Sequence, residues 1–294
     1  MAHITSKPKH CTPRQVVQNA VERVAKMESQ GEQTRSSNLI VGTILPDCEP
    51  VSQQWLDLQL RFLKATTKHF HHVSVVQKGE ITPFFNDNTE VIKIDGQPLA
   101  NSAAHVRGLE RLKTHFSNVQ NDFRHFLFID MDAFPVRRNW LEILLAQMKT
   151  EHEIAIPVRF ENLEQRLHSS ILFCKREALS NLRWSVKCVG NDLIGSREMD
   201  VTLEEYQVDR RRNVFTLIRS NAYQIHPLLC GMYYDLFYHN GCGSGRVYNM
   251  RSRPYWKHVV PQNVDVKDLI EQLFANPDNF IRSLGWKESD YGKV

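Results

Sequence analysis

Two aspartates separated by one residue follow a short apolar run in the middle of the chain, where residues 126–134 read FLFIDMDAF. Apolar residues without polar alternation predict a strand covered on both faces, so Asp130 and Asp132 come at the exit of a buried strand. Two carboxylates this close repel one another and lose hydration beside an apolar core, and a cation between them would offset that cost. Carboxylate oxygens suit Mg²⁺ or Mn²⁺, which keep coordination positions open for water and phosphate oxygens. The pair therefore predicts a divalent-metal site for phosphate chemistry.

The alternative is that one of these acids caps the helix that follows. That helix has a start of its own, because Asn139 is followed three residues later by Glu142 and then by apolar residues, which is the pattern of a capping box. The acids are not needed there, and this favours the metal interpretation.

A histidine and several glycines lie together far downstream, where residues 238–246 read YHNGCGSGR. The imidazole of His239 offers one nitrogen ligand, and the backbone at Gly241 and Gly243 can bring N–H groups close to a phosphate. The alternative is a surface turn with an incidental histidine, since the chain contains 13 histidines. No strand–turn–helix unit begins at these glycines, so a dinucleotide-binding fingerprint is not predicted.

The elements that must position these residues alternate between short apolar runs and helical patterns. We predict strands and helices over these ranges: strands 39–45, 73–77, 91–94, 126–129 and 154–158, and helices 51–68, 102–116 and 139–149. Such alternation is typical of an α/β fold with a mostly parallel central sheet flanked by helices. Ligands of open α/β sheets bind outside the carboxyl ends of the strands, where the acid pair and the segment from Thr43 to Asp47 both come.

The pattern is looser after about residue 159. Further strands are predicted over 169–174, 214–218 and 223–226, the acidic segment 198–206 is interpreted as helical, and a helix over 12–27 precedes the first strand. We predict three parts: an N-terminal helix and linker over 1–38, a catalytic domain over 39–260 with a decorated second half, and a C-terminal helical extension over 261–294.

Composition places the chain among ordinary globular proteins. It has 294 residues, of which 41% are hydrophobic and 24% charged, and its net charge is only +4. The small charge argues against a nucleic-acid partner but suits an enzyme that handles phosphate esters. The sequence has no transmembrane run and no signal-peptide pattern at its N-terminus, so a cytoplasmic protein is expected. Six scattered cysteines without a C-x-x-C pair predict neither a zinc site nor a disulfide framework.

With the acid pair at the end of the fourth strand of an α/β unit, residues 39–246 resemble the nucleotide-sugar glycosyltransferases of the GT-A fold, which is Rossmann-like. The D-x-D motif of that family binds a divalent ion on the sugar-nucleotide diphosphate, and the segment from Asp130 to Asp132 matches it in type and position. The resemblance implies a metal-dependent enzyme that moves a sugar from a nucleotide-diphosphate sugar to a hydroxyl acceptor, with Mn²⁺ or Mg²⁺ as the cofactor.

The resemblance also implies roles for particular residues. Asp130, Asp132 and His239 would be metal ligands, with Asp130 also near the ribose. Residues expected to contact the nucleotide diphosphate or to shape its site are Thr43, Asp47, Arg107, Gly241 and Gly243.

An inverting enzyme of this kind needs a carboxylate base for the acceptor hydroxyl. Asp192 is the first candidate, because it lies where the family places an acid, and Glu198 and Asp200 follow. The chain departs here from the commoner Glu-Asp pair, because Asn191 precedes Asp192. A capping acid in a loop is the alternative for Asp192.

Two other functions fit a pair of acids on a strand. A metal-dependent nuclease or phosphotransferase uses the same oxygen ligands. A non-catalytic sugar-nucleotide binding protein would keep the fold without the chemistry.

Overall fold

The computed structural model describes residue 22 and residues 38–45, 50–77, 89–94, 101–119, 122–159, 166–189, 198–203, 213–221, 230–241 and 266–284. The predicted helix over 12–27, apart from residue 22, and the predicted strand over 223–226 lie outside these ranges. None of the helices within them has the length and apolar character that crossing a membrane requires.

An eight-stranded sheet forms the centre of the described structure. Seven of its strands follow one another in the order β11-β6-β8-β4-β1-β2-β3, and β7 pairs with β6. Their bounds are β1 Leu39–Leu45, β2 Phe70–Val76, β3 Thr89–Lys93, β4 His125–Asp130, β6 Ile154–Arg159, β7 Arg166–Leu167, β8 Ile171–Lys175 and β11 Val214–Leu217. The predicted α/β fold with a mostly parallel sheet is confirmed.

Strand β8 is the exception within this path. It runs antiparallel to both of its neighbours, β4 and β6, whereas the other adjacent pairs of the path are parallel. The chain winds from β1 outward through β2 and β3, and then returns to β4 on the other side of β1. Such a reversal of winding is a topological switch point, and open α/β sheets bind ligands at the carboxyl ends of the strands beside it.

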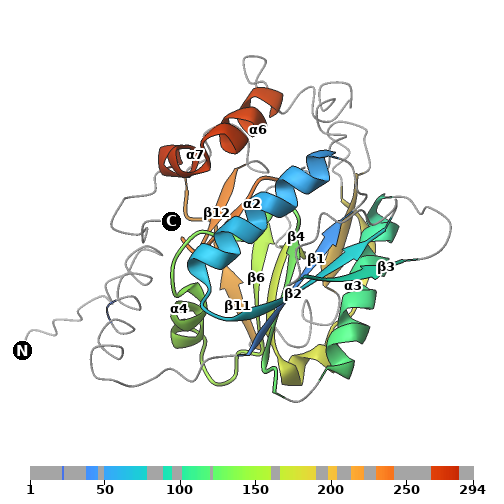
Figure 1. Cartoon of the computed structure of the whole chain (residues 1–294). Coiled ribbons are helices and arrows are strands. Elements are labelled where there is room, and N and C mark those ends of the chain that lie inside the picture. Colours follow the sequence, from blue (N-terminus) through green and yellow to red (C-terminus); the bar gives the residue numbers. More distant parts are fainter. Residues whose placement is uncertain are drawn as a thin grey trace, which may run out of the picture.

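Helices cover both faces of this sheet (Figure 1). Helix α2, Pro50–Thr66, lies on one face, and α3, Asn101–Asn118, lies on the other. Three more helices lie on the α2 side: α4, Trp140–Gln147, α6, Val266–Ala275, and α7, Pro277–Ser283. Their apolar residues share one core with those of α2. The α3 face also packs against the 3-10 helix Arg176–Asn181 and against Trp184 of β9, Trp184–Val189.

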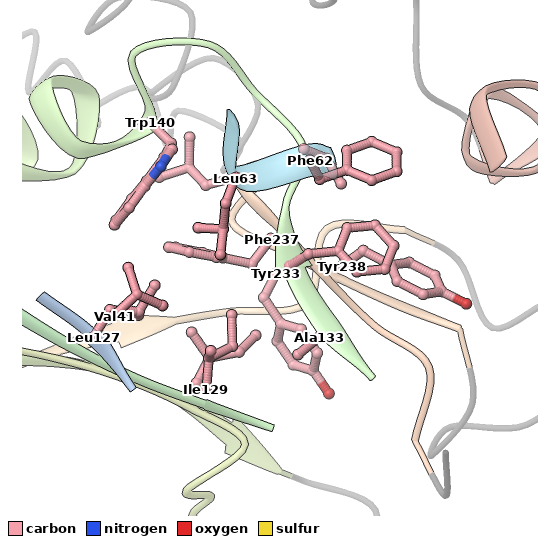
Figure 2. Packing of buried hydrophobic residues seen from close by; sticks show 14 of the residues in the cluster. Val41, Phe62, Leu63, Leu127, Ile129, Ala133, Trp140, Tyr233, Phe237 and Tyr238 are labelled. Carbon is pink, nitrogen blue, oxygen red and sulfur yellow. The ribbon is translucent and has the colours of Figure 1, made fainter. Parts of the chain in front are cut away.

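Strand β1 shows how the sequence divides between these faces. Leu39, Val41 and Leu45 belong to the core on the α2 side, and Ile40 and Ile44 to the core on the α3 side. All seven residues of β1 are buried, because alternating side chains meet a helix layer on each side. Figure 2 shows part of the α2-side core, where Val41 and Leu127 of the sheet lie below Leu63 and Trp140.

A second, three-stranded sheet extends from the carboxyl edge of the first. Its order is β12-β13-β5, formed by Gly231–Tyr233, Phe237–His239 and Ala133–Pro135. All three strands are short and buried, and β13 pairs antiparallel with both others. Because only Met131 and Asp132 separate the end of β4 from the start of β5, this sheet brings the 230–241 segment back to the acid pair.

Two local predictions are wrong. Residues 198–203 form a strand, β10, paired antiparallel with β9, rather than a helix. The sequence EMDVTL alternates polar and apolar residues, and this strand period decides the structure over the acidic composition. Helix α4 does begin after Asn139, but Asn139 has a left-handed backbone with φ 56° and makes no side-chain capping bond. Capping by a side chain requires a backbone in the extended region.

Candidate metal centre

Three potential metal ligands meet at the carboxyl edge of the central sheet. One ligand atom each from Asp130, Asp132 and His239 lies within 4.8 Å of the others. Asp130 is the last residue of β4, Asp132 lies in the turn before β5, and His239 is the last residue of β13. Residues more than a hundred positions apart in the chain are thus brought together, as the metal interpretation predicts.

The backbone explains how this meeting is arranged. His239 is the ladder partner of Ala133, which directly follows Asp132. The N–H of Asn240 donates to the carbonyl of Asp132 at 2.9 Å, and the N–H of Asp130 donates to the carbonyl of Ser170 at 2.9 Å. The turn between the two acids is therefore held from both the second sheet and the start of β8.

The ligands differ in their exposure. His239 and Asp132 are almost completely buried, and Nε2 of His239 lies 3.5 Å from Oδ1 of Asp132. The side chain of Asp130 is 20% exposed. A ligand that reaches the centre from solvent would therefore meet Asp130 first.

A second histidine lies against Asp130. Nε2 of His105, on α3, lies 3.0 Å from Oδ1 of Asp130. Burial raises the pKa of Asp130, but the charge and hydrogen bond of His105, and then the charges of His239 and His168, lower it by more, and the net pKa lies below its ordinary value. Asp130 is thus an anion at neutral pH.

A third histidine near this carboxylate is His168. It is buried between β7 and β8, its ring centroid lies 5.9 Å from that of His239, and its Nδ1 accepts the N–H of Ser170 at 3.2 Å. A neutral His168 then carries its hydrogen on Nε2, so it offers a donor rather than a lone pair. His168 suits the role of a neighbour to the ligands better than that of a ligand.

The donor set fits a divalent cation. Two carboxylates and an imidazole supply oxygen and nitrogen, and the nearly buried pair of Asp132 and His239 is surrounded by core residues. Imidazole nitrogen suits transition ions, while carboxylate oxygen suits Mg²⁺ and Mn²⁺. The mixed set therefore fits a divalent cation that accepts both kinds of donor.

The other predicted residues are placed as follows. Thr43 is fully buried on β1, and its hydroxyl is hydrogen bonded to Gln59 and lies 3.0 Å from His72. Arg107 is exposed on α3, two positions from His105, and residues two apart on a helix do not share a face. Gly241 has φ 71°, a left-handed backbone that glycine adopts without strain.

Asp47, Asp192 and Gly243 lie outside the described residues. Glu198 and Asp200 are described only as members of β10.

Sequence reasoning missed three residues beside this centre, His105, His168 and Gln59. Gln59 lies on α2 amid the apolar stripe of Trp55 and Phe62, and a buried glutamine in such a stripe is the one signal that could have identified it. His105 and His168 had no such signal, because their contacts join segments distant in sequence.

No protein-family model matches the chain, and no curated protein matches its sequence. Similar solved structures do exist, and three of them are glycosyltransferases. A mannosyltransferase from Pyrobaculum calidifontis, solved with GDP-Man and Mn²⁺, has 9% sequence identity, and the match covers 57% of this chain and 56% of that one at a TM-score of 0.36.

The second structure is the galactosyltransferase LgtC with donor and acceptor sugar analogues, at 12% identity over 46% of this chain and 57% of that one, with a TM-score of 0.31. The third is a glycosyltransferase involved in glycosylation of the major capsid of PBCV-1, at 9% identity over 49% and 62%, again with a TM-score of 0.31. This chain therefore matches less than two thirds of each protein's length. Likeness at this level assigns neither substrate nor activity, so the function has to be argued from the metal centre.

Proposed function

We propose that this protein is a metal-dependent glycosyltransferase that moves a sugar from a nucleotide-diphosphate sugar to a hydroxyl acceptor. The observation that carries the proposal is the meeting of Asp130, Asp132 and His239 at the carboxyl edge of β4, beside the switch point between β1 and β4. That edge is where open α/β sheets bind nucleotides. The D-x-D resemblance of the sequence supports the same activity.

In this proposal the nearly buried Asp132 and His239, together with the partly exposed Asp130, would hold Mn²⁺. When bound, the ion supplies Lewis-acid stabilisation of the nucleoside diphosphate that leaves as the glycosidic bond breaks. The pKa of Asp130 lies below its ordinary value, so this carboxylate is an anion that can meet a cation at neutral pH.

The remaining assignments follow from the resemblance. Asp47 contacts the nucleotide diphosphate, Gly241 and Gly243 bring backbone N–H groups to its phosphates, and Asp192 deprotonates the acceptor. Arg107 is assigned no contact here, because it does not share the face of α3 on which His105 meets Asp130. Thr43 contributes from within the core, since its side chain is fully buried.

The experiment is a thermal-shift titration with Mn²⁺, with uridine or guanosine diphosphate, and with both together. We expect Mn²⁺ alone to stabilise the protein, and the diphosphate to add stabilisation only when Mn²⁺ is present, because the diphosphate reaches the protein through the ion. The variant Asp132→Ala should lose this stabilisation, and Asp122→Ala, which removes an exposed acid outside the centre, should keep it. Normal Mn²⁺-dependent stabilisation of Asp132→Ala would overturn the metal assignment.

Activity assays separate the other functions. Sugar-nucleotide hydrolysis or transfer that Asp132→Ala abolishes supports the transferase. Cleavage of DNA or RNA would support a nuclease instead, and tight binding of the sugar nucleotide without turnover would support a binding protein.

A further inference from the structure

A buried glutamine holds the turn between the two aspartates at both of its ends. Nε2 of Gln59 donates to the carbonyl of Asp130 at 2.8 Å and to the carbonyl of Ala133 at 2.7 Å. The two carbonyls flank Met131 and Asp132, so the side-chain amide of Gln59 bridges the two ends of the turn. A side-chain amide nitrogen has two hydrogens, and both are used here.

The orientation of this amide is determined by a second contact. Thr43 of β1 donates its hydroxyl to Oε1 of Gln59 at 2.6 Å. Because carbonyls only accept, the nitrogen must face them and the oxygen must face Thr43, and no other orientation of the amide satisfies all three bonds.

The chain of bonds continues to a histidine. Nε2 of His72 lies 3.0 Å from the hydroxyl of Thr43. Since that hydroxyl donates its hydrogen to Gln59, it can only accept from His72, which fixes the hydrogen of a neutral His72 on Nε2. His72, Thr43 and Gln59 are each at most 1% exposed, so water does not compete for these bonds.

We infer that Gln59 is a positioning residue of the metal centre, and that Thr43 and His72 hold it in the required orientation. The name "turn clamp" is used here for these three residues, His72, Thr43 and Gln59. The clamp fixes the backbone on both sides of Asp132, while Asn240 fixes the carbonyl of Asp132 itself at 2.9 Å. Together they set the separation of 3.5 Å between Asp132 and His239. The inference rests on the proposed metal centre.

The test is the affinity for Mn²⁺ alone, measured by the electron paramagnetic resonance signal of the free ion. Gln59→Met keeps the length and the apolar environment of the side chain but removes the three bonds. We expect Mn²⁺ to bind about 10–100-fold more weakly, the usual consequence of removing a group that orients metal ligands. Gln53→Met is the matched control, because Gln53 lies on the same helix and its amide donates to Asp57 at 2.8 Å on the exposed side.

Two further variants keep the test decisive if Gln59→Met does not fold. Thr43→Val removes the hydroxyl that orients the amide and accepts from His72, and it should weaken Mn²⁺ binding. Thr43→Ser, which keeps the hydroxyl, should keep the wild-type affinity. A purely structural role would lower the melting temperature of these variants and leave the Mn²⁺ affinity of the folded protein unchanged, and that result would overturn the inference.

The variant Asp132→Ala distinguishes this failure from failure of the proposed function. If Asp132→Ala loses Mn²⁺ and a folded Gln59→Met does not, the metal centre stands and the turn clamp is wrong. If Asp132→Ala binds Mn²⁺ as tightly as the wild type, the metal centre is wrong, and the clamp inference is overturned with it.

Discussion

The two faces of the central sheet support the acid pair by different means. On the α2 face the turn clamp holds backbone carbonyls through hydrogen bonds between neutral, buried groups. On the α3 face His105, whose side chain is 24% exposed, meets the carboxylate of Asp130 itself. Neutral groups can be buried completely if they are hydrogen bonded, whereas charges are costly away from water. The backbone of the turn is thus positioned by buried groups, and the charge of Asp130 is balanced by a side chain nearer the surface.

The α3 side also differs in how its helix packs. A Cβ on Gly42 of β1 would lie 2.6 Å from Cζ of Phe116, and a Cβ on Gly108 of α3 would lie 2.9 Å from Cγ2 of Ile44. The two glycines allow α3 to approach β1 closely, and this brings His105 within reach of Asp130. On the α3 face, close packing of the helix against β1 thus brings His105 to Asp130. On the α2 face, hydrogen bonds hold the turn.

The largest effect is expected from the charged contact. His105→Ala should lower kcat/KM, and the affinity for Mn²⁺, by about 10–100-fold, because Asp130 loses the partner that orients it. His105→Gln should lose less, since an amide can still donate to the carboxylate. His115→Gln, a change on the same helix beside Glu90, is the control. Equal losses for the variants at 105 and 115 would show that α3, rather than the contact with Asp130, is responsible.

The buried face should respond to acid. Burial lowers the pKa of His72 to about 3, with smaller contributions from His71 and Lys64. Between this value and 6.5 the unfolded chain binds the proton and the folded protein does not, so the stability contribution is complete above pH 6.5 and is lost as the pH falls. We expect a loss of about 2–3 kcal/mol by pH 4.5, measured by urea unfolding at several pH values.

His72→Gln removes this titration and should flatten the profile, although its stability at pH 7 should be lower. His125, at the start of β4, has a pKa lowered to about 4 mainly by burial, and it adds a further loss of the same sign. A profile for His72→Gln as steep as that of the wild type would contradict the assignment to His72.

A steric change on the α3 face should affect folding without a titration. Gly42→Ala places a methyl group against Phe116 and Leu112, and overpacking of this kind costs about 1–3 kcal/mol. Urea unfolding should show this loss equally at pH 5 and pH 7. An unchanged midpoint would mean that the two side chains move aside freely.

The smallest effect is expected at the surface of the α2 face. Arg61 of α2 and Asp278 of α7 form an ion pair at 3.0 Å, with side chains 49% and 30% exposed. Asp278→Asn should cost less than about 1 kcal/mol, and less still in high salt, because exposed ion pairs are weak and screened. A larger loss would show that α7 depends on this pair more than on its buried Phe280 and Ile281.

Strands with uniform surroundings could be predicted from the sequence. The predicted strand 39–45 has the same bounds as β1, because every residue in it is apolar or small and all are buried. The acid pair could also be identified as a candidate site, since two charged residues at the end of an apolar run depart from the local pattern. The second sheet could not, because β5, β12 and β13 have three residues each and are too short to show a period.

The same limit applies to the metal centre. Asp130, Asp132 and His239 have side chains that coordinate metals, so their types indicated their role. Gln59 acts through bonds to backbone carbonyls, which any residue possesses, and Thr43 acts through its bond to the side chain of Gln59. Only the fold shows which groups these two side chains meet. The proposed metal ligands could thus be identified from the sequence, and the residues proposed to hold them in place could not.

The reversed direction of β8 changes which residues can reach the carboxyl edge of the central sheet. A parallel strand contributes there only the residues that follow it, but β8 enters the sheet from that end and contributes the residues that precede it, His168 to Ser170. An additional parallel strand in its place would need a crossover connection of a dozen residues or more to return the chain. The inverted strand β8 therefore gives the chain one more approach to the same edge, through the short buried turn from His168 to Ser170.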